Sequence, residues 1–118
     1  MQITREYDAH RSDSLIVLKL RGRIAPIDSS DAIDLGSLYG PEVFGRTVAF
    51  DLREADFLGS SGVNWLLTQR KEFVEAGGRM AICCTEGSVL DVLRMMRLDR
   101  LIPIADSPEK IPPSEPTA

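Results

Sequence analysis

The stretch VAFDLREADFLGSSG, residues 48–62, decides the fold of this chain together with VNWLLTQRKEFVEAGG, which follows it at residues 63–78. The pattern predicts a buried strand, a short link, a Gly-Ser-Ser-Gly turn and an amphipathic helix. Ser60 and Ser61 then lie on the first helical turn, where unpaired N–H groups and the helix dipole favour an anion such as phosphate. Ser60 is therefore either a phosphorylation switch or only a helix cap.

The helix predicted at residues 61–76 is ended by Gly77 and Gly78. Its apolar stripe consists of Val63, Leu66, Leu67, Phe73 and Val74. If this stripe is centred near Val63 and Leu67, Trp65 falls on roughly the opposite side of the helix. An outward Trp65, one turn from Ser60, is a common kind of interface anchor, and the alternative is that it tucks under a neighbouring loop.

Strands and helices alternate on both sides of this stretch. LIVLKLRGRI at residues 15–24 predicts a strand that forms an opening hairpin with residues 3–7. A short helix is expected after possible caps at residues 28–30, and the buried strand follows at residues 46–52. Beyond the long helix we expect a strand at 79–84, a helix at 87–96, a short strand at 101–104 and a helical turn in SPEK.

This order predicts an α/β fold with a mixed four- to five-stranded sheet, opened by a β-hairpin and with helices packed mainly on one face. One domain is expected at residues 1–110, followed by a flexible proline-rich tail at residues 111–118.

Composition and charge argue against several classes of function. The 118 residues carry a net charge of −4 with interspersed signs, so there is no basic stripe for nucleic acid. The apolar runs are too short to cross a membrane, and the N-terminus has no signal-peptide core, so we expect a cytoplasmic protein without membrane insertion. Cys83 and Cys84 are adjacent in a strand, and His10 is the single histidine, so no metal, redox or cofactor site is expected.

An enzyme is also not expected. Gly-Ser-Ser-Gly is one residue short of the Gly-x-Ser-x-Gly elbow of serine hydrolases, and His10 lies in a terminal turn. The chain has no Gly-x-x-x-x-Gly-Lys loop for a nucleotide. We therefore predict no catalytic residue.

Two segments resemble the STAS domains, a family named for sulfate transporters and anti-sigma factor antagonists. DLREADFLGSSGVNWLL resembles the strand end, serine turn and helix of the family, and VLDVLRMMRLDRLIPIADSPEKI resembles its last helix and strand. The resemblance covers nearly the whole chain and implies the STAS fold.

The resemblance implies a bacterial partner-switching protein. Such a domain binds an anti-sigma factor, which is a serine kinase of the histidine-kinase-like ATPase type, and thereby frees a sigma factor. The family's phosphorylated serine corresponds to Ser60, with Ser61 as the alternative. A phosphate adds roughly −1.5 to −2 charges at the contact surface, so binding is expected to be off when Ser60 is modified.

The sequence departs from the family pattern at three positions. Gly59 replaces the aspartate that normally precedes the two serines, and Ala25 occupies the acidic position of the Gly-x-Leu-Asp turn, where Asp28 could substitute. Arg97 falls where the family often has glycine. These departures keep a second interpretation open: a non-phosphorylated STAS adaptor in a signalling scaffold or on the ATPase of a lipid or anion transporter.

The segments that the family uses should meet at one end of the sheet. We expect a protein partner to contact the serine turn, the start of the following helix and the loop after the second strand. The predicted partner-binding residues are Arg23, Ile24, Ala25, Pro26, Asp28, Gly59, Ser60, Ser61, Gly62, Val63 and Trp65.

Overall fold

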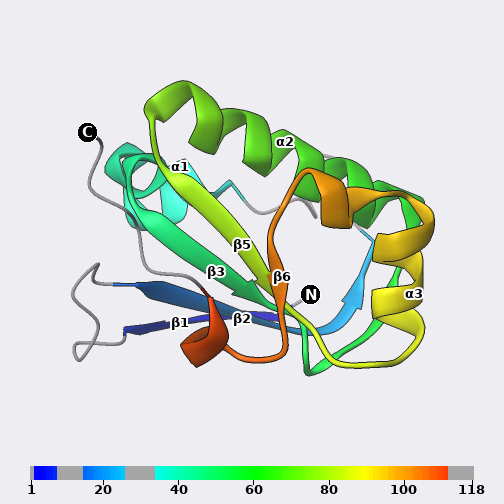
Figure 1. Ribbon diagram of the computed structural model, residues 1–118. Helices are drawn as coiled ribbons and strands as arrows, with labels where there is room; N and C mark the ends of the chain where they lie inside the picture. Colours follow the sequence, from blue (N-terminus) through cyan, green and yellow to red (C-terminus); the bar gives the residue numbers. More distant parts are fainter. Residues whose placement is uncertain (1, 8–14, 26–33, 112–118) are drawn as a thin grey trace.

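A computed structural model describes residues 2–7, 15–25 and 34–111 (Figure 1). The predicted hairpin is confirmed, because β1 (Gln2–Tyr7) pairs antiparallel with β2 (Ile16–Ile24). β2 pairs parallel with β3 (Thr47–Asp51), β3 with β5 (Arg79–Cys83) and β5 with β6 (Ile104–Ala105). The sheet is therefore mixed, in the order β1-β2-β3-β5-β6, and the predicted fold class is confirmed.

A further strand, β4 (Ala55–Leu58), lies where we expected only a short link. The far end of β2 pairs with β4 in parallel, after a register shift between Gly22 and Arg23. Gly22 has a φ of 79°, which glycine adopts without the steric cost of a side chain. β2 therefore leaves β3 after Lys19 and runs beside β4, so that both strands end where the serine turn begins.

The helices α1 (Leu35–Tyr39), α2 (Ser60–Ala76) and α3 (Ser88–Met95) lie on the same face of the sheet (Figure 1). Short 3-10 turns follow at η1 (Pro41–Gly45), η2 (Leu98–Arg100) and η3 (Pro108–Lys110). The caps predicted at residues 28–30 lie outside the described residues, and Asp34 caps α1 by accepting hydrogen bonds from two backbone N–H groups. The last strand was predicted too early, because η2 and the turn after it occupy residues 98–103.

Arg97 ends α3 in the left-handed conformation, with φ 59° and ψ 27°. Among the described residues it is the one non-glycine residue with a positive φ. This conformation costs an L-residue free energy that glycine does not lose, which agrees with the family's frequent glycine at this position.

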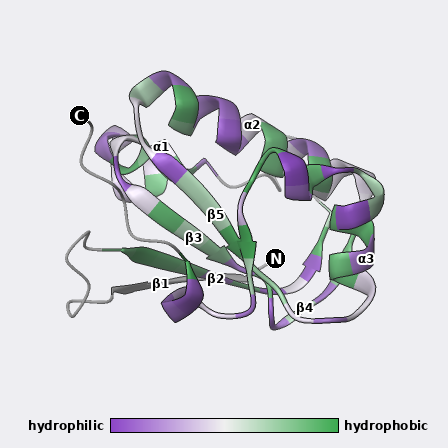
Figure 2. Cartoon of the chain, in the orientation of Figure 1, coloured by the Kyte–Doolittle hydropathy of each residue, from purple (hydrophilic) through white to green (hydrophobic). Residues whose placement is uncertain are grey.

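The core between the sheet and the helices contains a row of four aromatic rings. The ring of Phe73 lies 5.2 Å from that of Phe44 and 6.0 Å from that of Phe50, and Phe50 lies 5.7 Å from Trp65, all measured between centroids. Figure 2 shows that β3 is largely hydrophobic and that hydrophobic and hydrophilic residues alternate along α2. The row joins η1, β3 and both ends of α2, so it ties the long helix to the middle of the sheet.

The outward position of Trp65 was therefore a wrong prediction, since this residue is 5% exposed. The buried arc of α2 is centred near Leu66 and Phe73 rather than near Val63 and Leu67. At about 100° per residue, Trp65 lies at one edge of this arc instead of opposite it. Val74, which we placed inward, is 60% exposed for the same reason.

The other face of the sheet carries a smaller apolar cluster made of Leu15, Val17, Ala49, Ala81, Cys83 and Ile111. Cys83 points into this cluster and Cys84 into the main core, as predicted for adjacent residues of a strand. Burial raises the pKa of the Cys83 thiol to about 12, so this thiol is not a reactive nucleophile. Ile111, where we began the tail, is buried, and residues 112–118 lie outside the described part of the chain.

Candidate functional site

Ser60 is the first residue of α2 and is exposed, whereas Ser61 is half-buried. The N-cap position is occupied by Gly59, in extended conformation, so the prediction that Ser60 is the cap was wrong. The first turn of α2 contains no acidic side chain. Its N–H groups and the positive end of the helix dipole are therefore available to a group attached to the Ser60 hydroxyl.

The serine turn, residues 59–62, packs closely against the end of β2. The Gly59 N–H donates to the Ile24 carbonyl oxygen at 3.1 Å. Gly62 is buried, and a Cβ at this position would overlap the same carbonyl oxygen and approach Cδ1 of Leu58 to 2.8 Å. Glycine is therefore required at residue 62 by the close approach of α2 to β2 and β4.

Phe57 is a surface residue of this site that the sequence prediction missed. It is 40% exposed, and its ring carries the guanidinium of Arg23 at 4.0 Å from the centroid. Cε1 of Phe57 also lies 3.0 Å from where a Cβ of Gly59 would stand, and Cβ of Ala25 lies 3.2 Å from the same point. Alternation along β4 could have indicated it, because Leu58 points inward and its neighbour must point outward.

The structure divides the predicted partner-binding residues into three groups. Arg23, Ala25, Gly59, Ser60 and Ser61 lie together and are exposed or half-buried. Pro26 and Asp28 lie outside the described residues. Ile24, Gly62, Val63 and Trp65 are buried, so their predicted direct contact with a partner does not fit this structure; they hold the turn in place instead.

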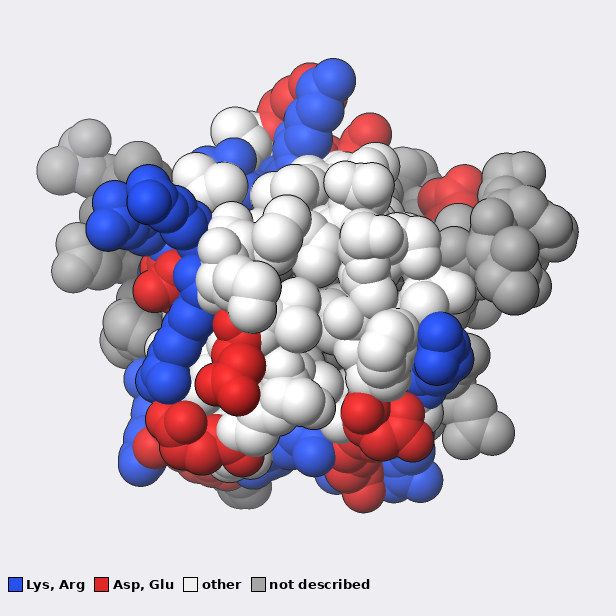
Figure 3. Space-filling model, turned by 90° about the vertical axis from the view of Figure 1, so that its right-hand side faces the viewer, with Lys and Arg blue, Asp and Glu red and all other residues white. Residues whose placement is uncertain are grey.

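The face of the molecule on the side of α3 is mostly uncharged. Figure 3 views the molecule from the side of α3 and the end of α2, and shows a broad surface without charged side chains, with acidic and basic groups around its edge. α3 adds two strongly exposed methionines, Met95 and Met96. Aromatic, methionine and arginine side chains are enriched in protein interfaces.

The sequence matches the family model of the STAS domain over residues 6–111. The chain belongs to the STAS domain family. A search of curated proteins finds no match to this STAS domain.

Solved structures show the same fold at low sequence identity. An anti-sigma factor antagonist from Mycobacterium paratuberculosis is 18% identical, with a TM-score of 0.61 and coverage of 92% of this chain and 89% of that one. The anti-sigma factor antagonist SpoIIAA in its unphosphorylated form is 17% identical, with a TM-score of 0.62 and 91% of each chain covered. The phosphorylated form of the Bacillus cell fate determinant SpoIIAA is 17% identical, with a TM-score of 0.58 and coverage of 91% and 95%.

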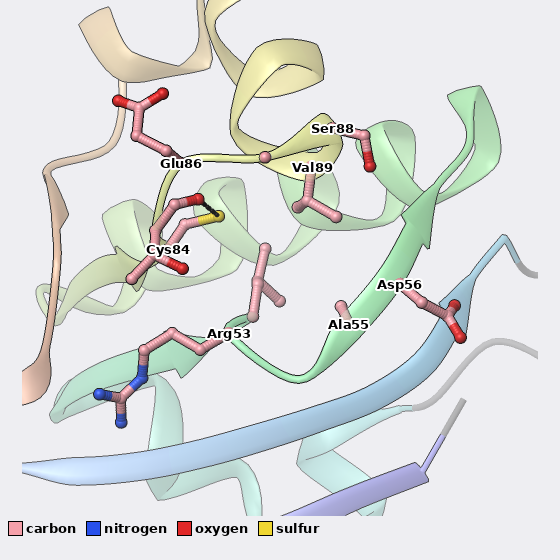
Figure 4. A pocket seen from close by; sticks show the side chains of 10 residues that line it. Arg53, Ala55, Asp56, Cys84, Glu86, Ser88 and Val89 are labelled. Carbon is pink, nitrogen blue, oxygen red and sulfur yellow. Dashed lines mark hydrogen bonds between the residues drawn. The ribbon is translucent and has the colours of Figure 1, made fainter.

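A hollow of about 170 Å³ lies beside the site, between the link that joins β3 to β4 and the start of α3 (Figure 4). Its charged residues Arg53, Asp56 and Glu86 point away from the hollow, and Val89 and Ala55 line its interior. Small-molecule sites need polar groups that converge on the ligand. The hollow is therefore not a good candidate for a ligand site of this STAS domain.

Two further searches of the described residues gave negative results. They contain no cluster of His, Cys, Asp and Glu side chains that could hold a metal ion. Within the same ranges, every helix is too short or too polar to cross a lipid bilayer.

The link from β3 to β4 is held by an ion pair between the buried Asp51 and the exposed Arg53. Asp51 is 3% exposed, and its two oxygens accept from Nε of Arg53 at 2.9 Å and from Nη2 at 2.8 Å. The Arg53 N–H also donates to Asp51 at 3.0 Å. Burial alone would raise the pKa of Asp51, but the hydrogen bonds and positive charge of Arg53 outweigh it, so the pKa lies below its usual value.

We expect Asp51→Asn to lower the free energy of unfolding at pH 7 by about 1–3 kcal/mol, because it removes the charge of a buried carboxylate that accepts hydrogen bonds from Arg53. The folded-state pKa of Asp51 is depressed, so its stabilisation is present above the unfolded pKa near ~4 and is lost as the pH falls through the folded pKa. Urea unfolding of both proteins between pH 7 and pH 2 measures this difference, which should narrow in acid.

Glu54→Gln is the matched control. Glu54 pairs with Arg21 at 2.9 Å, but both side chains are half exposed, so its loss should cost under about 0.5 kcal/mol. If the difference in the free energy of unfolding between wild type and Asp51→Asn stayed constant over the whole pH range, the stabilisation would not come from the ionised Asp51 carboxylate.

Proposed function

We propose that this STAS domain is an anti-sigma factor antagonist that binds a serine kinase of the histidine-kinase-like ATPase type and is released when that kinase phosphorylates Ser60. The observation that carries the proposal is that Ser60 is exposed at the start of α2, in a first turn without an acidic side chain. The shared fold with SpoIIAA, whose structure is known in a phosphorylated form, supports it. A cytoplasmic location follows from the proposal, because the kinase uses ATP.

We assign the contact with this partner to a docking face made of Arg23, Ala25, Phe57, Gly59, Ser60 and Ser61. Arg23 is of a type that often dominates binding energies, aromatic side chains such as Phe57 are enriched in protein interfaces, and the two are already stacked on each other. Preordered side chains lose less entropy when a partner binds. Phe57 therefore takes the role of aromatic anchor that we first gave to Trp65.

The proposed chemistry needs only an accessible hydroxyl from this domain. Oγ of Ser60 attacks the γ-phosphorus of ATP held by the kinase, ADP leaves, and the hydroxyl proton passes to a base of the kinase. A dianionic group then stands on a face that must lose its water to bind. The domain itself is expected to hydrolyse neither esters nor nucleoside triphosphates, since Ser60 has no activating base among the described residues.

Ser60→Asp should abolish binding to the cognate kinase, and Ser60→Ala should bind it whether or not ATP is present. Titration calorimetry with a purified candidate anti-sigma factor of the histidine-kinase-like ATPase type measures both. Because Gly59 rather than Ser60 is the N-cap, Ser60→Ala should change the free energy of unfolding by less than about 0.5 kcal/mol.

Ser61→Ala is the control for the site, and mass spectrometry after incubation with the kinase and ATP should show phosphate on Ser60. Phosphate on Ser61, or on neither serine, would remove the assignment. Unchanged binding by Ser60→Asp would favour the adaptor function, in which the serine turn is a fixed contact and Gly59 and Ala25 need no acidic replacement.

Phe57→Ala should weaken the same complex by about 2 kcal/mol, which is roughly thirtyfold in the dissociation constant. The reason is the loss of the exposed ring that also supports Arg23. Leu101→Ala is the matched control, because Leu101 is exposed to a similar degree but lies beside Arg70, toward the other end of α2. Equal affinities of wild type and Phe57→Ala would move the docking face elsewhere.

A further inference from the structure

Arg23 and Phe57 form an exposed pair directly beside the serine turn. The guanidinium of Arg23 stands 4.0 Å from the centroid of the Phe57 ring, and no ion pair holds it within residues 2–7, 15–25 and 34–111. The same ring borders Gly59, the residue before Ser60. An exposed cation–π contact is weak, so the guanidinium can leave the ring for a stronger partner at little cost.

Among the described residues, those of the turn and of the first turn of α2 carry no negative charge that would repel an anion on Ser60. Gly59 and Ala25 are uncharged, and the first turn of α2 carries no acidic residue. Asp56 on β4 is exposed, stands at the register shift between β2 and β4, and points away from the hollow of Figure 4. Arg21 on β2 is already paired with Glu54, which leaves Arg23 as the cation that the described contacts place next to the turn.

We propose that a phosphate on Ser60 draws the Arg23 side chain off the Phe57 ring and so disrupts the conformation of the docking face. A guanidinium binds a phosphate through two charged hydrogen bonds, which is a stronger interaction than stacking on an exposed ring. This inference rests on the proposed function, since it needs Ser60 to be the modified residue. It adds a conformational change to the repulsion that a phosphate causes at an interface.

The consequence is that one modification removes two contacts from the partner. Arg23 turns toward the phosphate, and Phe57 loses the side chain that holds its ring in place. Binding is then lost because both the conformation and the charge of the docking face have changed. Arg23 thus acts as a positioning residue that responds to the state of Ser60.

The test uses the full chain with phosphoserine encoded at position 60, so neither a kinase nor a partner is needed. A ³¹P NMR titration measures the second pKa of the phosphate, which should be lower in wild type than in Arg23→Gln by about half a pH unit. Arg23→Lys should recover part of this shift, because it keeps the charge but not the paired hydrogen bonds. Arg21→Gln is the matched control and should titrate like wild type.

A second measurement follows the ring itself. The nuclear Overhauser contact between the Arg23 side chain and the Phe57 ring should be present in the unmodified protein and absent in the phosphorylated one. Equal phosphate pKa values in wild type and Arg23→Gln, or a contact that survives phosphorylation, would overturn the inference. If both results are as expected but no kinase modifies Ser60, the proposed function fails while the response of Arg23 stands.

Discussion

Replacing Trp65 with alanine should lower the free energy of unfolding by about 3–5 kcal/mol, because it leaves a cavity in the row of aromatic rings. Trp65 is buried and contacts Phe50 at 5.7 Å between centroids, and Phe50 in turn contacts Phe73. A domain of this size has a total stability of about 5–15 kcal/mol, so the variant should be near its unfolding threshold. Urea denaturation followed by circular dichroism measures the change without relying on the fluorescence of the single tryptophan.

Trp65→Phe is the control, since it keeps an aromatic ring in the core and should lose clearly less stability than the alanine variant. A Trp65→Ala protein as stable as wild type, with weaker partner binding, would restore the sequence-based prediction of an outward anchor. Loss of binding by an unfolded variant would say nothing about the docking face, so stability must be measured first.

Gly62→Ala should destabilise the domain by about 3 kcal/mol or more, although alanine is the better helix former by about 1 kcal/mol. The added Cβ overlaps the carbonyl oxygen of Ile24, which belongs to the backbone of β2 and also accepts the Gly59 N–H. The added Cβ and the carbonyl group of Ile24 are both fixed to the backbone, so neither can move out of the way as the end of a flexible side chain can. The start of α2 must therefore move away from β2, and Ser60 moves with it.

Gly45→Ala is the matched control for this variant. The nearest atom to a Cβ at Gly45 is the Ala76 carbonyl oxygen at 3.8 Å, which is an ordinary contact, and the change should stay within about 0.5 kcal/mol. Thermal unfolding should show a large loss of stability for Gly62→Ala and little change for Gly45→Ala. A stabilised Gly62→Ala would mean that the helix propensity of alanine outweighs the overlap with the Ile24 carbonyl oxygen. Crystal structures of the two variants would then show whether Ser60 keeps its place.

Local patterns predicted the parts of the fold that depend on neighbours in the sequence. Alternating and continuous apolar runs placed β2, β3 and β5 within one or two residues, and Gly77 correctly marked the end of α2. β4 was missed, because four residues are too few to establish an alternating pattern in the sequence, and its pairing partner is the far end of β2. The last strand was predicted too early in the sequence. The turn at η2 ends through the tertiary packing of Leu98 and Ile102, and no local sequence signal marks its end.

By itself the sequence determined the order of the strands and helices other than β4, the start of a helix at the two serines and the absence of any acidic side chain in its first turn. These properties follow from residue type and spacing. Only the tertiary structure decided that Trp65 is buried, that Phe57 and Arg23 stack beside Ser60 and that Gly62 cannot be replaced. The physical reason is that each depends on which elements pack against α2: Phe50 of β3 sets the inward arc of the helix, and the curl of β2 toward β4 brings Arg23 to Phe57 from 34 positions earlier in the chain.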